Sequence, residues 1–288
     1  MSMLRWSVAL GLIALAAQIG VAQTAQSPEP AITLVREVVY NELHDHEHHG
    51  YWRYRIDRHT PNGIATEDQV ETAEGPVSWV TEGNGQPLNG AARAEEQARL
   101  ERLKASPQEQ ARHLRDYNKD EDRIGRIVRL LPDAFLYDFD GEENGCTRLR
   151  FHPNPSYPSH SIEARVFHSM SGVLLVDARY KRLAGLEGHI NQNVDFGFGI
   201  LGRIYKGGWF KLDRVRVSST DWKTDQLEVH LNIRALLVTS FARETSETRG
   251  AFEAVPARMS VAQGVALLEG SETVSSPRAV QTALVVNR

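Results

Sequence analysis

The sequence has little that could hold the chain together covalently or that announces a reaction. Cys146 is the only cysteine among 288 residues. An intrachain disulfide is therefore excluded, and the fold must be held by its core. The sequence also contains no Gly-x-Ser-x-Gly nucleophile elbow, no His-Glu-x-x-His zinc motif and no phosphate-binding glycine loop. These absences favour a protein that is not an enzyme and that uses no cofactor.

Long apolar runs are confined to the N-terminus. Arg5 precedes an apolar stretch at 8–21, and small residues follow at 20–22. This pattern predicts a signal peptide at 1–22, followed by a polar linker at 23–29. The stretch of about 14 residues is shorter than the roughly 20 that span a bilayer. We therefore expect an exported, periplasmic protein with no transmembrane segment in the mature chain.

Positive charge is not in excess. Without Arg5, 32 basic residues stand against 37 acidic ones, a net charge of about −5 with the histidines neutral. Nucleic-acid binding depends on basic surface, so a nucleic-acid partner is not expected. We expect a monomer whose possible partner is a lipid or a lipidated protein.

The strongest pattern lies between Gly172 and Phe241. At 227–241 every odd position except Thr239 is apolar, and this period of two predicts one long strand that is curved or bulged. No proline occurs between Pro158 and Pro256, as expected of paired strands. Glycines inside these segments predict strong curvature. Further strands are predicted at 172–177, 182–190 and 209–217, with Asp177 and Arg182 forming an ion pair across a turn.

Helical patterns occupy two other parts of the chain. Residues 32–43 predict one helix, with a strand as the alternative because Val38, Val39 and Tyr40 favour one. Residues 91–131 predict three helices. The second of these three begins at the capping residue Ser106, and the third begins at Asp120 and ends before Pro132. The third carries an apolar stripe of Ile124, Ile127, Val128 and Leu131. The first two of these three helices carry few large apolar residues, and we expect them to lie on the surface and to move as a lid.

Together these patterns predict an α+β fold. It is a single domain at 30–269, with a strongly curved antiparallel β-sheet that forms an incomplete barrel of about ten strands. Helices pack on one side, and a helical insertion occupies 88–131. A last helix is predicted at 260–268, before a disordered tail at 270–288.

Two groups of residues could form a site. An apolar cavity is predicted in the curved sheet, although ordinary core is the alternative; its expected lining is Phe196, Phe198, Ile200, Trp209, Leu227, Val229, Leu231, Ile233, Leu237 and Phe241. The second group is the histidine cluster at 44–49. On a helix, His44 and His48 lie one turn apart and could chelate zinc or copper, whereas on a strand His44, His46 and His48 would share a face. The plainer interpretation of His44, His46, His48 and His49 is a solvated helix end, and no metal site is assigned.

Three segments carry a resemblance. They are Gly-Cys-Thr-Arg-Leu-Arg-Phe-His-Pro-Asn-Pro-Ser-Tyr-Pro at 145–158, Ser-Gly-Val-Leu-Leu-Val-Asp at 171–177 with Arg182-Leu183, and Val-Asp-Phe-Gly-Phe-Gly at 194–199. They are similar to exported proteins of unassigned function from soil bacteria. Those proteins resemble, in architecture, the periplasmic lipoprotein-carrier superfamily. The resemblance implies an incomplete barrel with helices over its open side and a cavity for acyl chains.

The leading hypothesis is therefore a non-enzymatic periplasmic carrier or binding protein for an acyl chain, a lipid or a lipidated partner. One alternative is an envelope scaffold or assembly protein that binds another protein through its sheet edge or helical arm. The other is a metal-dependent enzyme that uses the cluster from His44 to His49.

Overall fold

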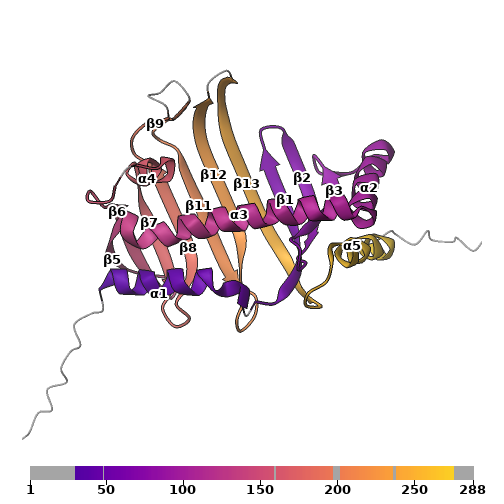
Figure 1. The fold of residues 1–288 in the computed structure, drawn as a ribbon, viewed down its shortest axis with the longest axis horizontal. Coiled ribbons are helices and arrows are strands. Elements are labelled where there is room, and N and C mark those ends of the chain that lie inside the picture. The colour runs from indigo at the N-terminus through magenta and orange to yellow at the C-terminus, as the bar shows by residue number, and fades with distance from the viewer. Residues whose placement is uncertain (1–29, 48, 159, 197–201, 236–237, 276–288) are drawn as a thin grey trace, which may run out of the picture.

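An antiparallel sheet forms the framework of the protein in the computed structural model, which describes residues 30–47, 49–158, 160–196, 202–235 and 238–275 (Figure 1). Thirteen strands are formed by the described residues, in the order β4-β3-β2-β1-β13-β12-β11-β8-β7-β6-β5, with β10 paired to β12 and β9 paired to β10. The strands are β1 (Tyr51–Thr60), β2 (Gly63–Val70), β3 (Val77–Gly83), β4 (Gln86–Pro87), β5 (Phe135–Glu143), β6 (Cys146–Pro153), β7 (Met170–Asp177), β8 (Arg182–Ile190), β9 (Val194–Phe196), β10 (Gly202–Ile204), β11 (Trp209–Arg216), β12 (Trp222–Ala235) and β13 (Val238–Val255).

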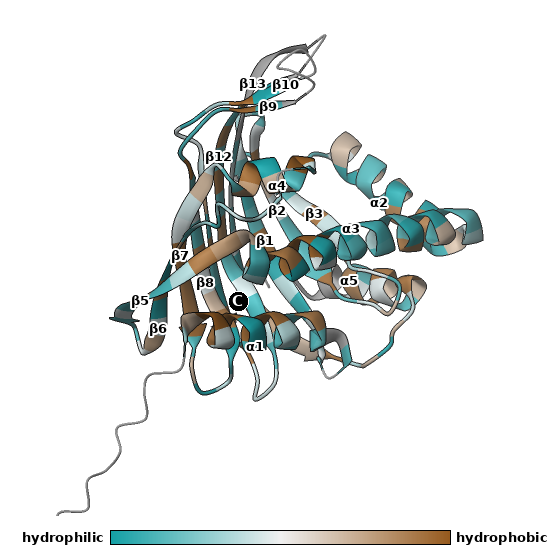
Figure 2. Ribbon diagram, turned by 60° about the vertical axis from the view of Figure 1, so that its left-hand side comes forward, coloured by the Kyte–Doolittle hydropathy of each residue, from teal (hydrophilic) through white to brown (hydrophobic). Residues whose placement is uncertain are grey.

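The helices lie across one face of this sheet (Figures 1 and 2). They are α1 (Ala31–Leu43), α2 (Gly90–Ala105), α3 (Pro107–Ala134), α4 (Ile162–Phe167) and α5 (Val261–Ser275), with a short 3₁₀ turn, η1 (Asp45–Glu47), after α1. The predicted α+β class with an antiparallel sheet is confirmed. The sheet is not closed and has 13 described strands rather than about ten, because β9, β10 and the two-residue β4 add short strands beyond the long ones.

The predicted single strand at 227–241 is wrong, because the segment contains the end of β12 and the start of β13. Ala235 pairs with Val238, and a register shift then places Ile233 opposite Phe241. After this shift, odd-numbered residues of β12 stand opposite odd-numbered residues of β13, as Ile233 and Phe241 do. Paired residues share a face of the sheet, so the odd-numbered residues of both strands lie on the same face. The period of two therefore continues through the hairpin, and neither Gly, Asn nor Asp occurs at 236–237 to mark the turn.

The helical segment also differs from the prediction. One helix, α3, runs from Pro107 to Ala134 without a break at Asp120, and Pro132 lies inside its last turn. The Ser106 hydroxyl caps the start as predicted, accepting a hydrogen bond from the Glu109 backbone N–H at 3.3 Å. No glycine or proline separates the stretch around Asp120 from the helix before it, so nothing forces a new start. At the C-terminus α5 continues to Ser275, beyond the expected start of the tail.

Three sets of buried side chains fix the helices over the sheet. Val35 and Val38 of α1 pack with Leu149 of β6 and Val176 of β7, and all four are nearly inaccessible to solvent. Ile127 and Leu131 of α3 pack against a second cluster that contains Phe135 and Phe151. At the other end of the sheet, α2 and α5 pack together with β2 and β3. Burying such side chains stabilises this arrangement by about 1.5–3 kcal/mol each.

Strand β5 is the last strand at one end of the sheet. It carries the acidic residues Asp138, Asp140, Glu142 and Glu143. Two of them are held by arginines of the neighbouring strand: Arg148 pairs with Asp140 and with Glu143, the latter at 3.1 Å. Charged side chains of this kind are typical of exposed sheet edges.

Candidate functional site

A cavity of about 600 Å³ lies between α1, α3 and the face of the sheet that these helices cover. Its lining is largely apolar, with a few polar and charged residues. The lining residues of α1 and α3 are Val35, Val38, Val39, Glu42, Glu121, Ile124, Ile127, Val128 and Leu131; those of the sheet and α4 are Phe135, Tyr137, Phe151, Phe167, Met170, Leu174, Leu183, Leu186, Phe210, Leu212, Arg214 and Thr224. A volume of this size is typical of small-molecule sites.

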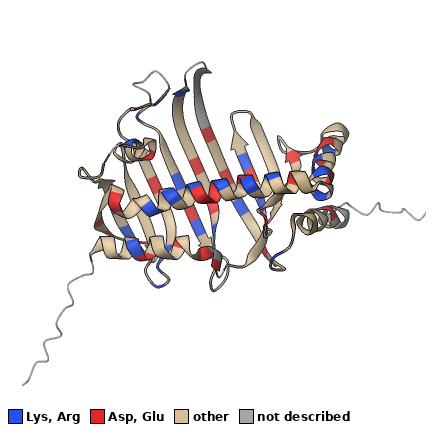
Figure 3. Ribbon diagram, in the orientation of Figure 1, with Lys and Arg blue, Asp and Glu red and all other residues tan. Residues whose placement is uncertain are grey.

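The two helices contribute one apolar stripe each. Side chains three and four positions apart lie on the same side of a helix, so Val35, Val38 and Val39 of α1 face the cavity together. The same spacing brings Ile124, Ile127, Val128 and Leu131 of α3 into the lining. Charged residues of both signs follow one another along α3 (Figure 3). The predicted apolar stripe of α3 is thus the roof of the cavity.

The sheet forms the floor. Leu174, Leu186 and Leu212 stand directly opposite one another on β7, β8 and β11, so they form a row across three strands. Beside this row Gly172 and Gly188 also stand opposite each other. A Cβ at Gly188 would lie 2.5 Å from the ring of Phe210, and one at Gly172 would lie 1.8 Å from the carbonyl oxygen of Glu187. At Gly172 the obstacle is backbone, so only glycine fits, whereas at Gly188 a side chain would require the ring of Phe210 to move.

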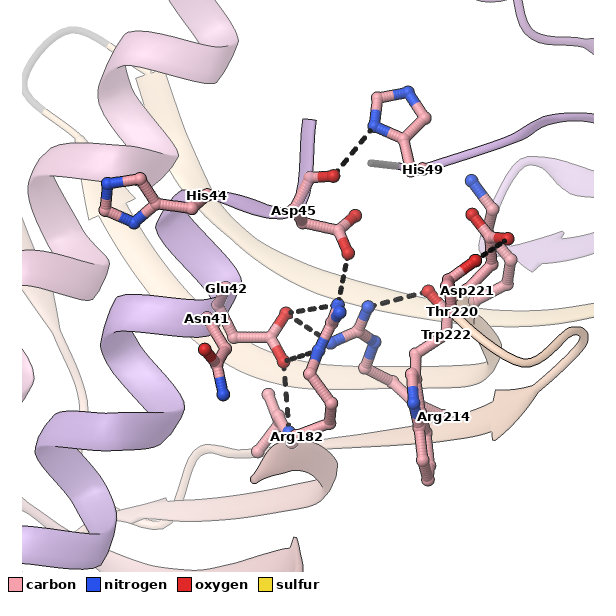
Figure 4. Close-up of polar contacts among 12 residues, drawn as sticks. Asn41, Glu42, His44, Asp45, His49, Arg182, Arg214, Thr220, Asp221 and Trp222 are labelled. Carbon is pink, nitrogen blue, oxygen red and sulfur yellow. Dashed lines mark hydrogen bonds and ion pairs between the residues drawn. The ribbon is translucent and has the colours of Figure 1, made fainter. Parts of the chain in front are cut away.

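A cluster of four charged residues lies at the end of α1 (Figure 4), and two of them, Glu42 and Arg214, line the cavity. The carboxylate of Glu42, on the last turn of α1, accepts from the Arg182 Nε at 3.0 Å and from an Arg214 terminal nitrogen at 2.6 Å. Arg182 also donates to Asp45 at 2.5 Å, and Arg214 donates to the backbone carbonyl of Trp222 at 2.7 Å. The cluster therefore ties the end of α1 to β8 and β11.

These charges are well shielded from water. The side chains of Arg182, Arg214 and Glu42 are 10%, 12% and 15% exposed. Burial raises the pKa of the Glu42 carboxyl, but the nearby guanidinium groups of Arg214 and Arg182 outweigh burial and hold that pKa below its ordinary value. The cluster balances two positive charges, on Arg182 and Arg214, with two carboxylates, on Glu42 and Asp45.

Acid is expected to weaken the attachment of α1. Because the pKa of Glu42 is lowered in the folded protein, its contribution to stability is complete above the ordinary value of about 4.5 and is lost as the pH falls through the lowered value. Urea unfolding between pH 7 and pH 3 measures this loss. The Glu42→Gln variant should show a flatter fall in the free energy of unfolding below about pH 4.5 than the wild type. Parallel curves for the two proteins would show that Glu42 is not ionised in the way described.

The predicted cavity residues of β12 lie on the covered face. Leu227 stands opposite Leu212 and Val229 stands opposite Phe210, and paired residues share a face. Leu231 packs beside the cluster that contains Phe135 and Phe151, and Ile233 stands opposite Ile204 of β10. These four residues continue the floor on the next strand, although the cavity itself is lined from β12 by Thr224.

Other predicted residues lie elsewhere. The ring of Trp209 stacks on His230 with centroids 4.2 Å apart, on the face opposite to Phe210 and thus away from the cavity. Phe198, Ile200 and Leu237 lie outside the described residues, as do the side chains of Phe196 and Phe241. The predicted ion pair between Asp177 and Arg182 is wrong. Asp177 accepts from the backbone N–H groups of Arg179 and Tyr180 instead, which leaves Arg182 to the cluster at Glu42.

The histidine cluster follows α1. His44 contacts the carbonyl oxygen of Tyr40 through Nδ1 at 2.7 Å and stacks on the Tyr40 ring, and His49 contacts the carbonyl oxygen of Asp45 at 3.3 Å. His48 and the side chain of His46 lie outside the described residues. Within the part of the chain that is described, no three His, Cys, Asp or Glu residues are grouped as a metal ion would require.

The helix side of the cavity was not among the predicted site residues, and neither was the charged cluster. The stripe on α3 was a usable signal, because it is apolar on a helix that is otherwise highly polar. The partners of Glu42 gave no such signal, since Arg182 is 140 positions away and Arg214 is 172.

Comparisons with known proteins give no relative for this arrangement: no protein-family model matches the chain, and no curated protein matches it significantly. Among the described helices, none is both long enough and apolar enough to cross a membrane.

Proposed function

We propose that the protein is a non-enzymatic, periplasmic binding protein or carrier for an acyl chain, a lipid or a lipidated partner. The observation that supports the proposal is the cavity under α1 and α3, with its largely apolar lining and a volume of about 600 Å³. In this view the sheet acts as an incomplete barrel, and the two helices cover its open side.

The apolar lining would supply the affinity. Each buried methylene contributes about 0.8 kcal/mol, so ten methylenes contribute roughly 8 kcal/mol. That free energy corresponds to a dissociation constant in the micromolar range. Binding of this strength suits a carrier that must also release its ligand.

The helices would control access. The cavity lies between α1, α3 and the sheet, and the end of α1 is attached to the sheet by ion pairs of Glu42 and Asp45 with Arg182 and Arg214. Separating α1 or α3 from the sheet would open the cavity without breaking a strand pairing, because neither helix belongs to the β-ladder.

Native mass spectrometry of the gently purified protein tests the proposal. An acyl-bearing molecule is expected to co-purify as a discrete added mass, and delipidated protein should bind a twelve-carbon chain with a micromolar dissociation constant. A protein that carries no added mass, and that binds no acyl chain after delipidation, would contradict it.

A further inference from the structure

The apolar cavity has charged residues in its lining, and their nature bears on what the ligand carries. Arg214 lines the cavity, and Arg182 lies next to it, bonded to the same carboxylate of Glu42. Guanidinium groups bind carboxylates and phosphates through paired, charge-assisted hydrogen bonds. The carboxylate of Glu42, held by Arg182 and Arg214, already occupies this place, so the protein itself supplies an anion here.

We propose that this arginine pair is the headgroup site for an amphiphile whose apolar chain ends in an anionic carboxylate or phosphate, and that the anion takes the place of the Glu42 carboxylate. The proposal rests on the proposed function, since the chain of the ligand would lie in the apolar part of the same cavity. It adds the chemical class of the ligand and the position of its head.

Charge balance favours an anion over other headgroups. When Glu42 leaves and an anion enters, Arg182 and Arg214 keep their partners and Asp45 keeps its contact with Arg182. A neutral head could not compensate two buried guanidinium groups, and leaving a buried charge without a partner is costly. Glu121 of α3 also lines the cavity and would repel an anion close to it, so the head is expected on the side of the sheet, at Arg214.

The exchange would be coupled to the cover. Glu42 lies on α1, whereas Arg182 and Arg214 lie on β8 and β11. Displacing its carboxylate removes bonds between α1 and the sheet, including the one from the backbone N–H of Leu183 at 3.0 Å. An anionic ligand would thus loosen the end of the helix that covers it, and the helix would compete with the ligand for the same two arginines.

Calorimetric titration of delipidated protein with four twelve-carbon amphiphiles tests this: laurate, dodecyl phosphate, dodecanol and dodecyltrimethylammonium, each below its micelle concentration. Laurate, dodecyl phosphate or both should bind at least about tenfold more tightly than dodecanol. The tighter of the two anions identifies a carboxylate or a phosphate head. The trimethylammonium compound should bind most weakly.

Two variants should move laurate affinity in opposite directions. Arg214→Gln should weaken laurate binding about tenfold, because one donor group is lost. Glu42→Gln should strengthen it about tenfold, because the competing carboxylate becomes neutral while the arginines remain. Neither change should alter dodecanol affinity by more than about threefold. Arg36→Gln, which removes a charge from the exposed side of α1, is the matched control and should bind like the wild type.

The outcomes separate the two proposals. Equal affinities for laurate and dodecanol, tighter binding of the trimethylammonium compound, or laurate affinity unchanged in Glu42→Gln would overturn the headgroup site and leave the acyl cavity standing. Absence of binding for all four amphiphiles would overturn the proposed function itself. Should Arg214→Gln unfold, the Glu42→Gln arm still decides, because it predicts a gain of affinity that misfolding cannot produce.

Discussion

A Leu212→Trp variant is expected to keep its fold and to lose most of its affinity for an acyl chain. Leu212 lines the cavity from β11, in the row with Leu174 and Leu186. An indole ring at this position would extend into the space above the sheet, where the chain of the ligand is proposed to lie. We expect a loss of affinity for laurate and dodecanol alike of at least about tenfold, which is the loss of about two buried methylenes or more.

Val215→Trp is the matched control for this change. Val215 lies three residues further along β11, on the other face, and it is 39% exposed. The same indole is added to the same strand, so effects of the tryptophan itself are shared by the two variants. Val215→Trp should bind both amphiphiles as the wild type does. If Leu212→Trp binds them equally well, the cavity is not the binding site.

Replacement of Arg182 by glutamine should have the largest effect on stability. Arg182 is buried, bonds to Glu42 and Asp45, and connects the end of α1 to β8. Without it, Asp45 loses a charge-assisted hydrogen bond, and Glu42 keeps Arg214 as its one charged partner in the cluster beside the backbone N–H of Leu183. Breaking a buried ion pair by removing one partner costs about 3–5 kcal/mol. This loss should be measurable as a lower free energy of unfolding in urea at pH 7.

Arg148→Gln on β6 is the comparison for Arg182→Gln. Arg148 also bridges two carboxylates, those of Asp140 and Glu143, but its side chain is 32% exposed. An ion pair near the surface contributes only about 0–1 kcal/mol. A loss of similar size in the two variants would show that burial of the cluster does not set its strength.

Much of the fold could be predicted from local patterns, because the spacing of apolar residues along a segment indicates which face of the helix or strand is buried. The predicted helix at 32–43 and the predicted strands at 172–177 and 182–190 are confirmed in this way, as α1, β7 and β8. The pattern failed at the β12–β13 hairpin, because a register shift near Ile233 keeps odd residues on one face in both strands. A hairpin without a glycine or asparagine turn leaves no break in such a pattern.

The predicted lining residues that lie in the described part of the chain all belong to the sheet and to none of the helices. Most of these lie on β12, the strand next to β11, whereas the floor of the cavity is formed by β7, β8 and β11. Alternation is clearest in β12, so the predicted lining followed Leu227 and Val229. In β7 and β8, Gly172 and Gly188 interrupt the pattern, although they stand at the floor of the cavity. The charged cluster depends on tertiary pairing of Glu42 with Arg182 and Arg214, which no local pattern records.

The open edge of the sheet at β5 has a consequence for the protein at high concentration. An unpaired strand can anneal with the same strand of another copy, and repetition of that contact builds fibrils. Asp138 and Glu142, which are not paired with Arg148, would bring carboxylates of two copies close together across such a contact. Like charges opposite each other destabilise the pairing. The acidic border should therefore protect this protein from polymerising through its own framework, even when it is abundant.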